Sequence, residues 1–310
     1  MKLFFAATVI AAGALLSSCG STGRVGANSG GRPSVLRYAA SSAQEDPATA
    51  SPRQEYMRSY LERQLNMPVQ IVQTTRYGSV IEAFRSHKIE VASIAPFSYI
   101  LATQMLPIEA IVMVGSAAGE PGEYNGALVV PGNSPIHSVD DLIRHSKELT
   151  ISFVDPASAS GFLVENAFLQ SKGLEPQRDF KQVVFSMSHP ASVLTLKSGK
   201  VDVAACMLRI VKRYEDTGKL AKGDIRIIWI SPDIPNQPIA VRKDLPADLK
   251  ESIQRALIDM PRNDPVAWAN QVSKTIPRLP GQVYVAANDQ MFDGLRAMAR
   301  GAKNINLLEH

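Results

Sequence analysis

Two serines and a glycine stand together in residues 155–161, which read DPASASG, between a stretch with strand character and a stretch with helix character. Small hydroxyl residues at such a junction cap the helix and leave backbone N–H groups pointing outward. Helix N-termini attract anions through these N–H groups and through the helix dipole. The turn therefore favours a tetrahedral oxyanion, held by two hydroxyls and adjacent amides. Plain N-capping is the alternative, and the spacing alone does not decide between them.

Three further residues stand at other strand-to-helix junctions. His189 precedes Pro190, which suits the first turn of a helix, and a histidine there can donate to a bound anion that favours its protonated form. Tyr77 and Tyr99 can each offer a phenolic donor from the opposite half of the chain. The alternatives are a histidine that caps its own helix and tyrosines that pack in the core.

Other chemistries lack their motifs. Asp155, Ser158 and His189 are the residue types of a hydrolytic triad, but no G-x-S-x-G elbow presents the serine. No His, Cys or Asp cluster has metal-ligand spacing, and no phosphate-loop or dinucleotide glycine pattern is present. These absences leave an enzyme unsupported without excluding one, and we predict no cofactor and no metal.

The elements that position these residues alternate between strand and helix. Strands are expected at 34–40, 69–75, 90–94, 110–115, 128–131, 150–154, 182–185, 201–205 and 225–230. Helices are expected at 52–65, 79–86, 97–105, 139–145, 161–172, 190–198, 247–260, 265–274 and 289–300. Alternation of this kind favours parallel sheets covered by helices, which bind ligands where strands hand over to helices.

The chain of 310 residues exceeds what one hydrophobic core usually serves, and it carries a faint internal repeat. Residues 79–92 and 192–204 each combine a helix, a turn with lysine and a strand of similar sequence. Two similar α/β lobes that face each other explain this repeat.

The composition is that of an ordinary globular protein, with 45% apolar and 20% charged residues and a net charge of +4. The basic residues are scattered, so no nucleic-acid surface is indicated.

The first residues predict export. Lys2 is followed by an apolar stretch of about 14 residues at 3–16, which is shorter than the ~20 that span a bilayer and is typical of a secretory signal. The stretch ends in Leu-Ser-Ser before Cys19, which resembles the bacterial lipobox; an ordinary signal peptide with a chance cysteine is the alternative. We expect a signal peptide at 1–18, acylation of Cys19, a tether at 19–33 and a tag remnant at 308–310. The protein would then lie outside the cytoplasm, anchored to the membrane by lipid.

Cys206 is the only other cysteine, so no internal disulfide is predicted once Cys19 is acylated. Its apolar neighbours favour a small buried side chain.

Four segments, at 77–83, 96–99, 155–163 and 189–193, resemble in order and spacing the substrate-binding proteins of phosphonate ABC transporters, the PhnD-like family. The resemblance runs from about Val35 to beyond Asp289. It implies the type II periplasmic-binding-protein fold, in which two lobes, each a mixed and mostly parallel sheet flanked by helices, are joined by a two-strand hinge and hold the ligand in the cleft between them. We expect lobe 1 at 34–125 and 240–307, and lobe 2 at 126–239.

The resemblance also implies roles for single residues. Ser158, Ala159, Ser160 and His189 would hold the phosphoryl oxygens from one lobe, and Tyr77 and Tyr99 would close on the ligand from the other. The family's serine loop commonly reads Ser-Thr-Ser, so Ala159 removes one hydroxyl but keeps its amide.

Two positions bear on ligand identity. Family members that bind aminoethylphosphonate are expected to place acidic residues where this chain has Arg209 and Gln237. A cationic Arg209 would repel an ammonium group, which favours phosphite, methylphosphonate, phosphate or a phosphonocarboxylate. A solvated helix residue is the alternative for Arg209.

Together these observations predict a monomeric solute-binding lipoprotein that captures a phosphonate or related phosphorus oxyanion and delivers it to an ABC permease and ATPase complex. The alternatives are a binding protein for a sulfonate or carboxylate, and an enzyme or sensory protein that reuses the fold.

Overall fold

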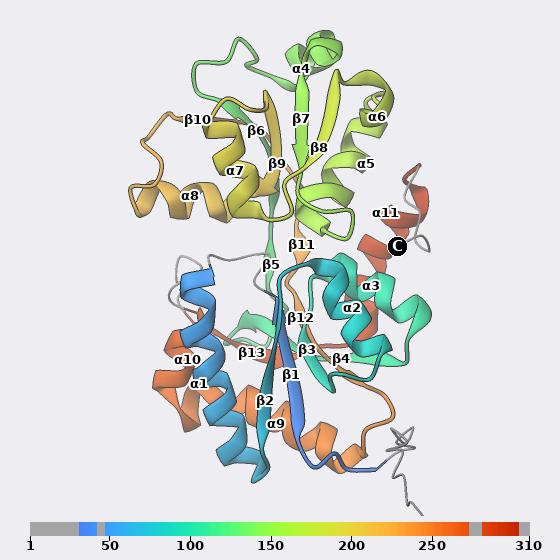
Figure 1. Ribbon diagram of the computed structural model, residues 1–310, viewed down its shortest axis with the longest axis vertical. Coiled ribbons are helices and arrows are strands. Elements are labelled where there is room, and N and C mark those ends of the chain that lie inside the picture. Colours follow the sequence, from blue (N-terminus) through green and yellow to red (C-terminus); the bar gives the residue numbers. More distant parts are fainter. Residues whose placement is uncertain (1–30, 42–46, 273–280, 304–310) are drawn as a thin grey trace, which may run out of the picture.

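The computed structural model describes residues 31–41, 47–272 and 281–303, which form two lobes stacked along the long axis of the molecule (Figure 1). The predictions for the signal peptide, for Cys19 and for residues 308–310 lie outside the described residues. Among the described residues, no helix combines the length and the apolar character that a membrane crossing requires.

The first sheet, with its helices, forms lobe 1. Its strand order is β13-β4-β12-β3-β1-β2. The strands are β1 (Leu36–Ser41), β2 (Val69–Thr74), β3 (Val91–Ser93), β4 (Ile108–Ser116), β12 (Pro238–Arg242) and β13 (Gln282–Ala286). β1 is parallel to β2 and β3, whereas β12 and β13 run antiparallel to their neighbours.

Successive side chains of each strand point to opposite faces of this sheet, so each face has its own hydrophobic core. Helices cover both cores. Against one face pack α1 (Pro47–Leu65), α9 (Ala247–Asn263) and α10 (Pro265–Val272). Against the other face pack α2 (Tyr77–Arg85), α3 (Pro96–Met105), the short helix η3 (Asp289–Phe292) and α11 (Asp293–Gly301).

The second sheet, with its helices, forms lobe 2. Its strand order is β10-β6-β9-β7-β8. The strands are β6 (Gly126–Pro131), β7 (Thr150–Phe153), β8 (Gln182–Phe185), β9 (Val203–Met207) and β10 (Ile225–Ile230). Its helices are α4 (Val139–His145), η1 (Ser146–Glu148), the π-helical turn η2 (Ala159–Leu163), α5 (Val164–Ser171), α6 (Pro176–Asp179), α7 (His189–Lys197) and α8 (Leu208–Asp216).

Two short antiparallel strands, β5 (Glu123–Tyr124) and β11 (Ile234–Pro235), lie between the lobes where the chain crosses from one to the other (Figure 1). The first sheet takes its strands from residues 36–116 and 238–286, and the second takes its strands from 126–230. A single crossing pair is suited to a hinge, because it constrains the two lobes less than a continuous sheet would.

All nine expected strands are present, with ends within two residues of the predicted ones. Four strands and one long helix were not predicted: β5, β11, β12, β13 and α8. The strand β13 lies in the part of the chain where only helices were expected. These strands have two to five residues each, and they pair antiparallel with strands that are distant in the sequence. The local sequence pattern therefore gives little information from which to predict them.

The internal repeat occupies equivalent places in the two sheets. In lobe 1, α2 leads to β3, which lies between the parallel β1 and the antiparallel β12. In lobe 2, α7 leads to β9, which lies between the parallel β7 and the antiparallel β6. The two lobes therefore share one order of elements, and the loops that precede α2 and α7 are counterparts.

Candidate functional site

The serine turn, residues 155–161, follows β7 and is fixed by its own hydrogen bonds. Asp155 Oδ1 accepts from the amide of Ala157 at 2.8 Å, and the Asp155 carbonyl accepts from the amide of Ser158 at 2.9 Å. Ser158 Oγ accepts from the amide of Gly161 at 3.1 Å and so caps the helix. A Cβ atom at Gly161 would overlap the side chain of Val154, so this position requires glycine. The turn is therefore held rigidly before any ligand binds.

The helix that begins at the serine turn starts with a π-helical turn, where an ordinary α-helix was predicted. Leu163 N donates to the Ser158 carbonyl at 3.0 Å, five residues back. The amides of Ala159 and Ser160 lie in the first turn, where a helix offers no acceptor for them. Ser158, Ala159 and Ser160 are all at most 1% exposed. Buried N–H groups at a helix start suit an anion.

His189 lies at the first position of α7 and does not cap it, because Ser188 Oγ accepts from the Ala191 amide at 3.1 Å. Its Nδ1 instead accepts from the amide of Met207 at 3.0 Å. Since the lone pair of Nδ1 is used, the ring proton must sit on Nε2, which is then a donor.

Burial, reinforced by the nearby charge of Arg209, lowers the pKa of His189 to about 3. Protonation at Nδ1 would also oppose the Met207 amide proton. The structure therefore favours a neutral imidazole that donates from Nε2, and the expectation that a bound anion favours the protonated form stays a prediction.

Arg209 lies in the first turn of α8 and points toward the hinge. Its Nε donates to the sulfur of Met207, and its guanidinium carbon lies 4.9 Å from the centre of the Tyr124 ring. Burial raises the pKa of Tyr124 to about 12, while Ser160 and the charge of Arg209 oppose that rise. These contacts bring Arg209 beside the serine turn and disfavour the alternative of a solvated helix residue.

Lobe 1 covers the serine turn with apolar side chains and with a serine hydroxyl that donates to it. Tyr77 and Ala95 pack with Val154 and Ala157 of lobe 2 in one buried cluster. Ser98 Oγ donates to the Ala157 carbonyl across the cleft at 3.0 Å. The starts of α2 and α3 therefore meet the serine turn directly.

Tyr99 and Gln237 make their contacts inside lobe 1. The Tyr99 hydroxyl donates to Asp289 Oδ1 at 3.0 Å and accepts from the Ala110 amide at 3.1 Å. Its ring packs 4.9 Å from that of Phe292. Gln237 Nε2 donates to Ser93 Oγ at 2.9 Å. The structure thus places Tyr77 against the serine turn that holds Ser158, Ala159 and Ser160. His189 and Arg209 meet at Met207, whereas these contacts of Tyr99 lie within lobe 1.

Glu165 is a buried carboxyl group next to this cluster that the sequence did not single out. Burial raises its pKa well above the ordinary value. A Cβ atom built on Gly126 would overlap a Glu165 carboxyl oxygen and lie against Ser160, so the three residues are neighbours. The sequence offers no local signal for this contact, because Gly126 lies on β6, a strand distant from Glu165 along the chain.

Cys206 is fully buried and free, and burial raises the pKa of its thiol. This agrees with the predicted role as a small buried side chain. Within the described part of the chain, no group of His, Cys, Asp or Glu is arranged to hold a metal ion.

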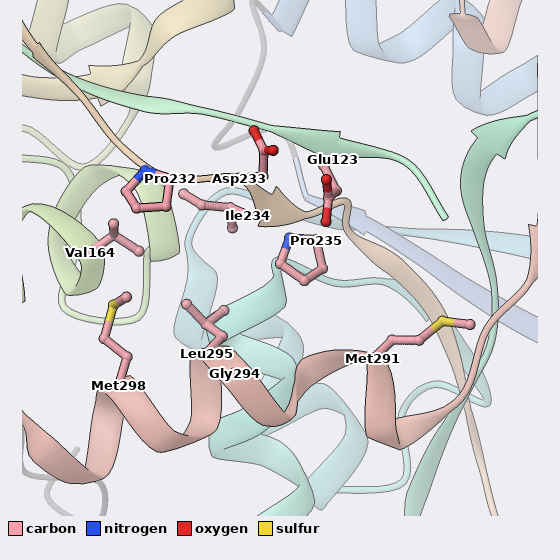
Figure 2. Close-up of a pocket in the computed structure, with 10 residues that line it drawn as sticks. All are labelled: Glu123, Val164, Pro232, Asp233, Ile234, Pro235, Met291, Gly294, Leu295 and Met298. Atoms are coloured by element: carbon pink, nitrogen blue, oxygen red, sulfur yellow. The ribbon is translucent and has the colours of Figure 1, made fainter. Parts of the chain in front are cut away.

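A pocket of about 360 Å³ lies between the hinge strands and α11 (Figure 2). It is lined by Glu123, Val164, Pro232, Asp233, Ile234, Pro235, Met291, Gly294, Leu295 and Met298. Its walls are mainly apolar, and its two charged side chains are both carboxylates. Such a pocket disfavours an anion, so the candidate site remains the serine turn and its neighbours.

Comparison with known proteins bears on the family and the fold. The family model described as the periplasmic substrate-binding protein of phosphonate ABC transporters matches residues 40–292. A crystal structure of the binding protein component of an ABC phosphonate transporter from Pseudomonas aeruginosa has the same fold, with a TM-score of 0.77 at 22% identity over 88% of this chain and 87% of that one.

Two curated relatives are also similar. The phosphonates-binding periplasmic protein of Escherichia coli is 30% identical over 193 residues, which are 62% of this chain and 56% of that protein. The phosphate-import protein PhnD of Mycolicibacterium smegmatis is 26% identical over 261 residues, which are 80% of this chain and 79% of that protein. The match thus spans little more than half the length of the first relative.

Proposed function

The chain belongs to the family of periplasmic substrate-binding proteins of phosphonate ABC transporters, and we propose that it captures a small phosphorus oxyanion for import. The candidate ligands are a phosphonate such as methylphosphonate, phosphite and phosphate. The two curated relatives are named for phosphonates and for phosphate, which supports this class of ligand.

The observation that carries the proposal is the buried helix start at the serine turn. This helix start offers two amides without an intrahelical acceptor and the hydroxyls of Ser158 and Ser160. We propose that Nε2–H of His189, at the start of α7 in the same lobe, completes the set of donors. Charge-assisted hydrogen bonds are the strong ones, and the oxygens of a phosphoryl group can accept several at once. Arg209 adds a positive charge beside them.

Lobe 1 would act as the cover. When the starts of α2 and α3 close on the serine turn, they exclude water and strengthen every electrostatic interaction inside. Tyr77 is the lobe 1 residue whose ring packs on the serine turn, and Ser98 is the one that bonds to it. The closed protein then presents both lobes to the permease.

The ligand is expected to lack an amine. An ammonium group near the serine turn would meet the positive charge of Arg209 and would find Gln237 in place of an acid. Phosphite, methylphosphonate and phosphate carry no ammonium group. A phosphonocarboxylate carries a second negative charge, which the positive charge of Arg209 would attract.

The setting of the protein is part of the proposal. A signal peptide and an acylated Cys19 would hold the monomeric protein on the outer side of a membrane, next to its permease and ATPase complex. Several buried acyl chains contribute ~0.8 kcal/mol per CH₂, enough for stable anchoring.

A thermal-shift screen tests the proposed ligand class. Ligand at 100 times its Kd adds about 2.7 kcal/mol to the free energy of unfolding, which raises Tm by several degrees for a chain of this size. We expect stabilisation by methylphosphonate, phosphite or phosphate, and none by an alkanesulfonate or acetate. Stabilisation by the sulfonate or the carboxylate alone would overturn the proposal, and turnover of the ligand during incubation would favour an enzyme.

A further inference from the structure

Glu165 carries a carboxyl group that is buried without a partner. Its side chain is fully buried, and neither carboxyl oxygen has a hydrogen-bond partner among the residues that the structure describes. An ionised carboxylate in such surroundings costs several kcal/mol, so the group keeps its proton instead. The raised pKa of Glu165, caused by burial, agrees with this.

The carboxyl group of Glu165 lies beside Ser160 of the serine turn. A Cβ atom built on Gly126 of β6 would come within 3.2 Å of the Ser160 Cβ atom and would also overlap Glu165, so the two side chains meet at this glycine. Gly126 of β6 provides the space, because a Cβ atom there would overlap the Glu165 carboxyl group. One side chain therefore separates Glu165 from the proposed anion.

No cation neutralises Glu165 among the described residues. The titratable groups that face it are the hydroxyl of Tyr124 on β5 and the thiol of Cys206 on β9, and both respond to its charge. Arg209 contacts the Tyr124 ring. The elements β6 and η2 carry no titratable side chain. Arg296 pairs with Asp293 within α11, and Arg178 pairs with Asp179 within α6.

We propose that Glu165 is a positioning residue whose protonation is coupled to anion binding, so that the site binds its ligand only while Glu165 is neutral. This inference rests on the proposed function, because it places the anion at Ser160. An ionised Glu165 would repel that anion across a short path of low dielectric constant. By linkage, the bound anion stabilises the protonated carboxyl group to the same extent.

The coupling has a defined proton balance. Below the pH at which Glu165 ionises, the anion binds with no proton exchanged by this residue. Above it, each anion bound takes up one proton from solvent onto the carboxylate. The affinity then falls by up to about tenfold per pH unit, beyond any change that comes from the ligand's own ionisation.

The variant Glu165→Gln separates these effects, because its amide has the shape of the neutral acid and cannot ionise. The matched control is Glu148→Gln, whose side chain is 80% exposed on the surface of lobe 2. Affinities of all three proteins for methylphosphonate, phosphite and phosphate are measured by titration calorimetry from about pH 6 to about pH 9. Comparing proteins with the same ligand cancels the ionisation of the ligand.

We expect E165Q to bind as the parent does at the lowest pH and progressively more tightly than the parent as the pH rises, with E148Q following the parent. The infrared carbonyl band of a protonated acid should also be present in the parent at neutral pH and missing in E165Q. This band is read on the parent protein, so it judges the proposal even if E165Q fails to fold.

Three results would overturn the coupling while leaving the proposed function intact. They are parallel affinities of parent and E165Q across the pH range, a parent without the protonated-acid band, and tight binding of 2-aminoethylphosphonate that E165Q loses. In the last case Glu165 is the ionised partner of an ammonium group. If the parent binds none of the three anions at any pH, the proposed function itself fails and the coupling falls with it.

Discussion

The two lobes share one order of elements but offer different chemistry at the same junction. In lobe 1 the edge strand β2 passes to α2 at Tyr77, and in lobe 2 the edge strand β8 passes to α7 at His189. Tyr77 lies in an apolar cluster with Ala95. His189 bonds to the backbone of β9 and presents a donor.

The difference indicates that lobe 2 recognises the ligand and that lobe 1 closes over it. The polar groups of lobe 2 are held by bonds within lobe 2, such as the capping bond of Ser158 and the bond from Met207 to His189. Lobe 2 can therefore recognise an anion before the cleft closes. Lobe 1 contributes apolar surface and a hydrogen bond from Ser98 to the serine turn, so we expect that it mainly excludes water. Changes in lobe 2 should then cost more affinity than changes in lobe 1.

The largest expected effect comes from His189→Ala. Loss of a hydrogen bond to a charged group costs ~1.5–3 kcal/mol, so affinity for the ligand should fall by ~10–100-fold. Titration calorimetry with the ligand found by thermal shift measures it. Unchanged affinity would mean that His189 does not contact the ligand, and that lobe 2 does not recognise the anion in the way proposed here.

The second effect is on stability and follows from the neutral state of His189. Its folded pKa of about 3 lies below the ordinary unfolded value near 6.5. As the pH falls below about 6.5, His189 binds a proton in the unfolded chain but stays neutral in the folded chain. The free energy of unfolding should then fall with a slope of up to about 1.4 kcal/mol per pH unit from this group, and the slope should end near pH 3.

Urea unfolding of the parent and of His189→Asn at several pH values checks this slope. Asparagine keeps an acceptor for the Met207 amide but does not titrate. His145→Gln, at a half-exposed side chain, is the control. Glu165 acts in the opposite sense, because its raised pKa removes stability as the pH rises above about 4.5, so only the difference between parent and variant reports on His189. Parallel curves would mean that His189 titrates normally.

The third comparison lies within the serine turn. Ser158 caps the helix, whereas Ser160 has no capping role. Ser158→Ala should therefore lower the free energy of unfolding by about 1 kcal/mol, and Ser160→Ala should lower it by less. Both variants should weaken ligand binding by ~10–100-fold if both hydroxyls donate to the anion. A loss of stability without a loss of affinity in both would favour plain capping.

Much of the fold and part of the site could be predicted because their signals are local. Apolar runs between turn residues located nine strands, and hydroxyl residues before a helix located the serine turn. Tyr99 could not be judged this way, since its partner Asp289 lies 190 residues away along the chain. Glu165 was missed because it meets Ser160 at Gly126 of β6, which is distant along the chain. The strand β12 depends on pairing with β3 and β4, which no local pattern records.

The smallest effect should come from lobe 1, where Ser98→Ala removes the bond to the Ala157 carbonyl across the cleft. A neutral hydrogen bond contributes about 0.5–1.5 kcal/mol, and this one forms only when the lobes meet, so the affinity should fall by roughly two- to tenfold. The loss should appear in the dissociation rate, because the bond holds the closed state and plays no part in the first encounter. Stopped-flow measurement of both rates decides this, with Ser86→Ala as the control, because the exposed Ser86 hydroxyl bonds within lobe 1 at the end of α2. A loss as large as that of His189→Ala, or one confined to the association rate, would mean that lobe 1 takes part in recognition and that the lobes divide the work differently.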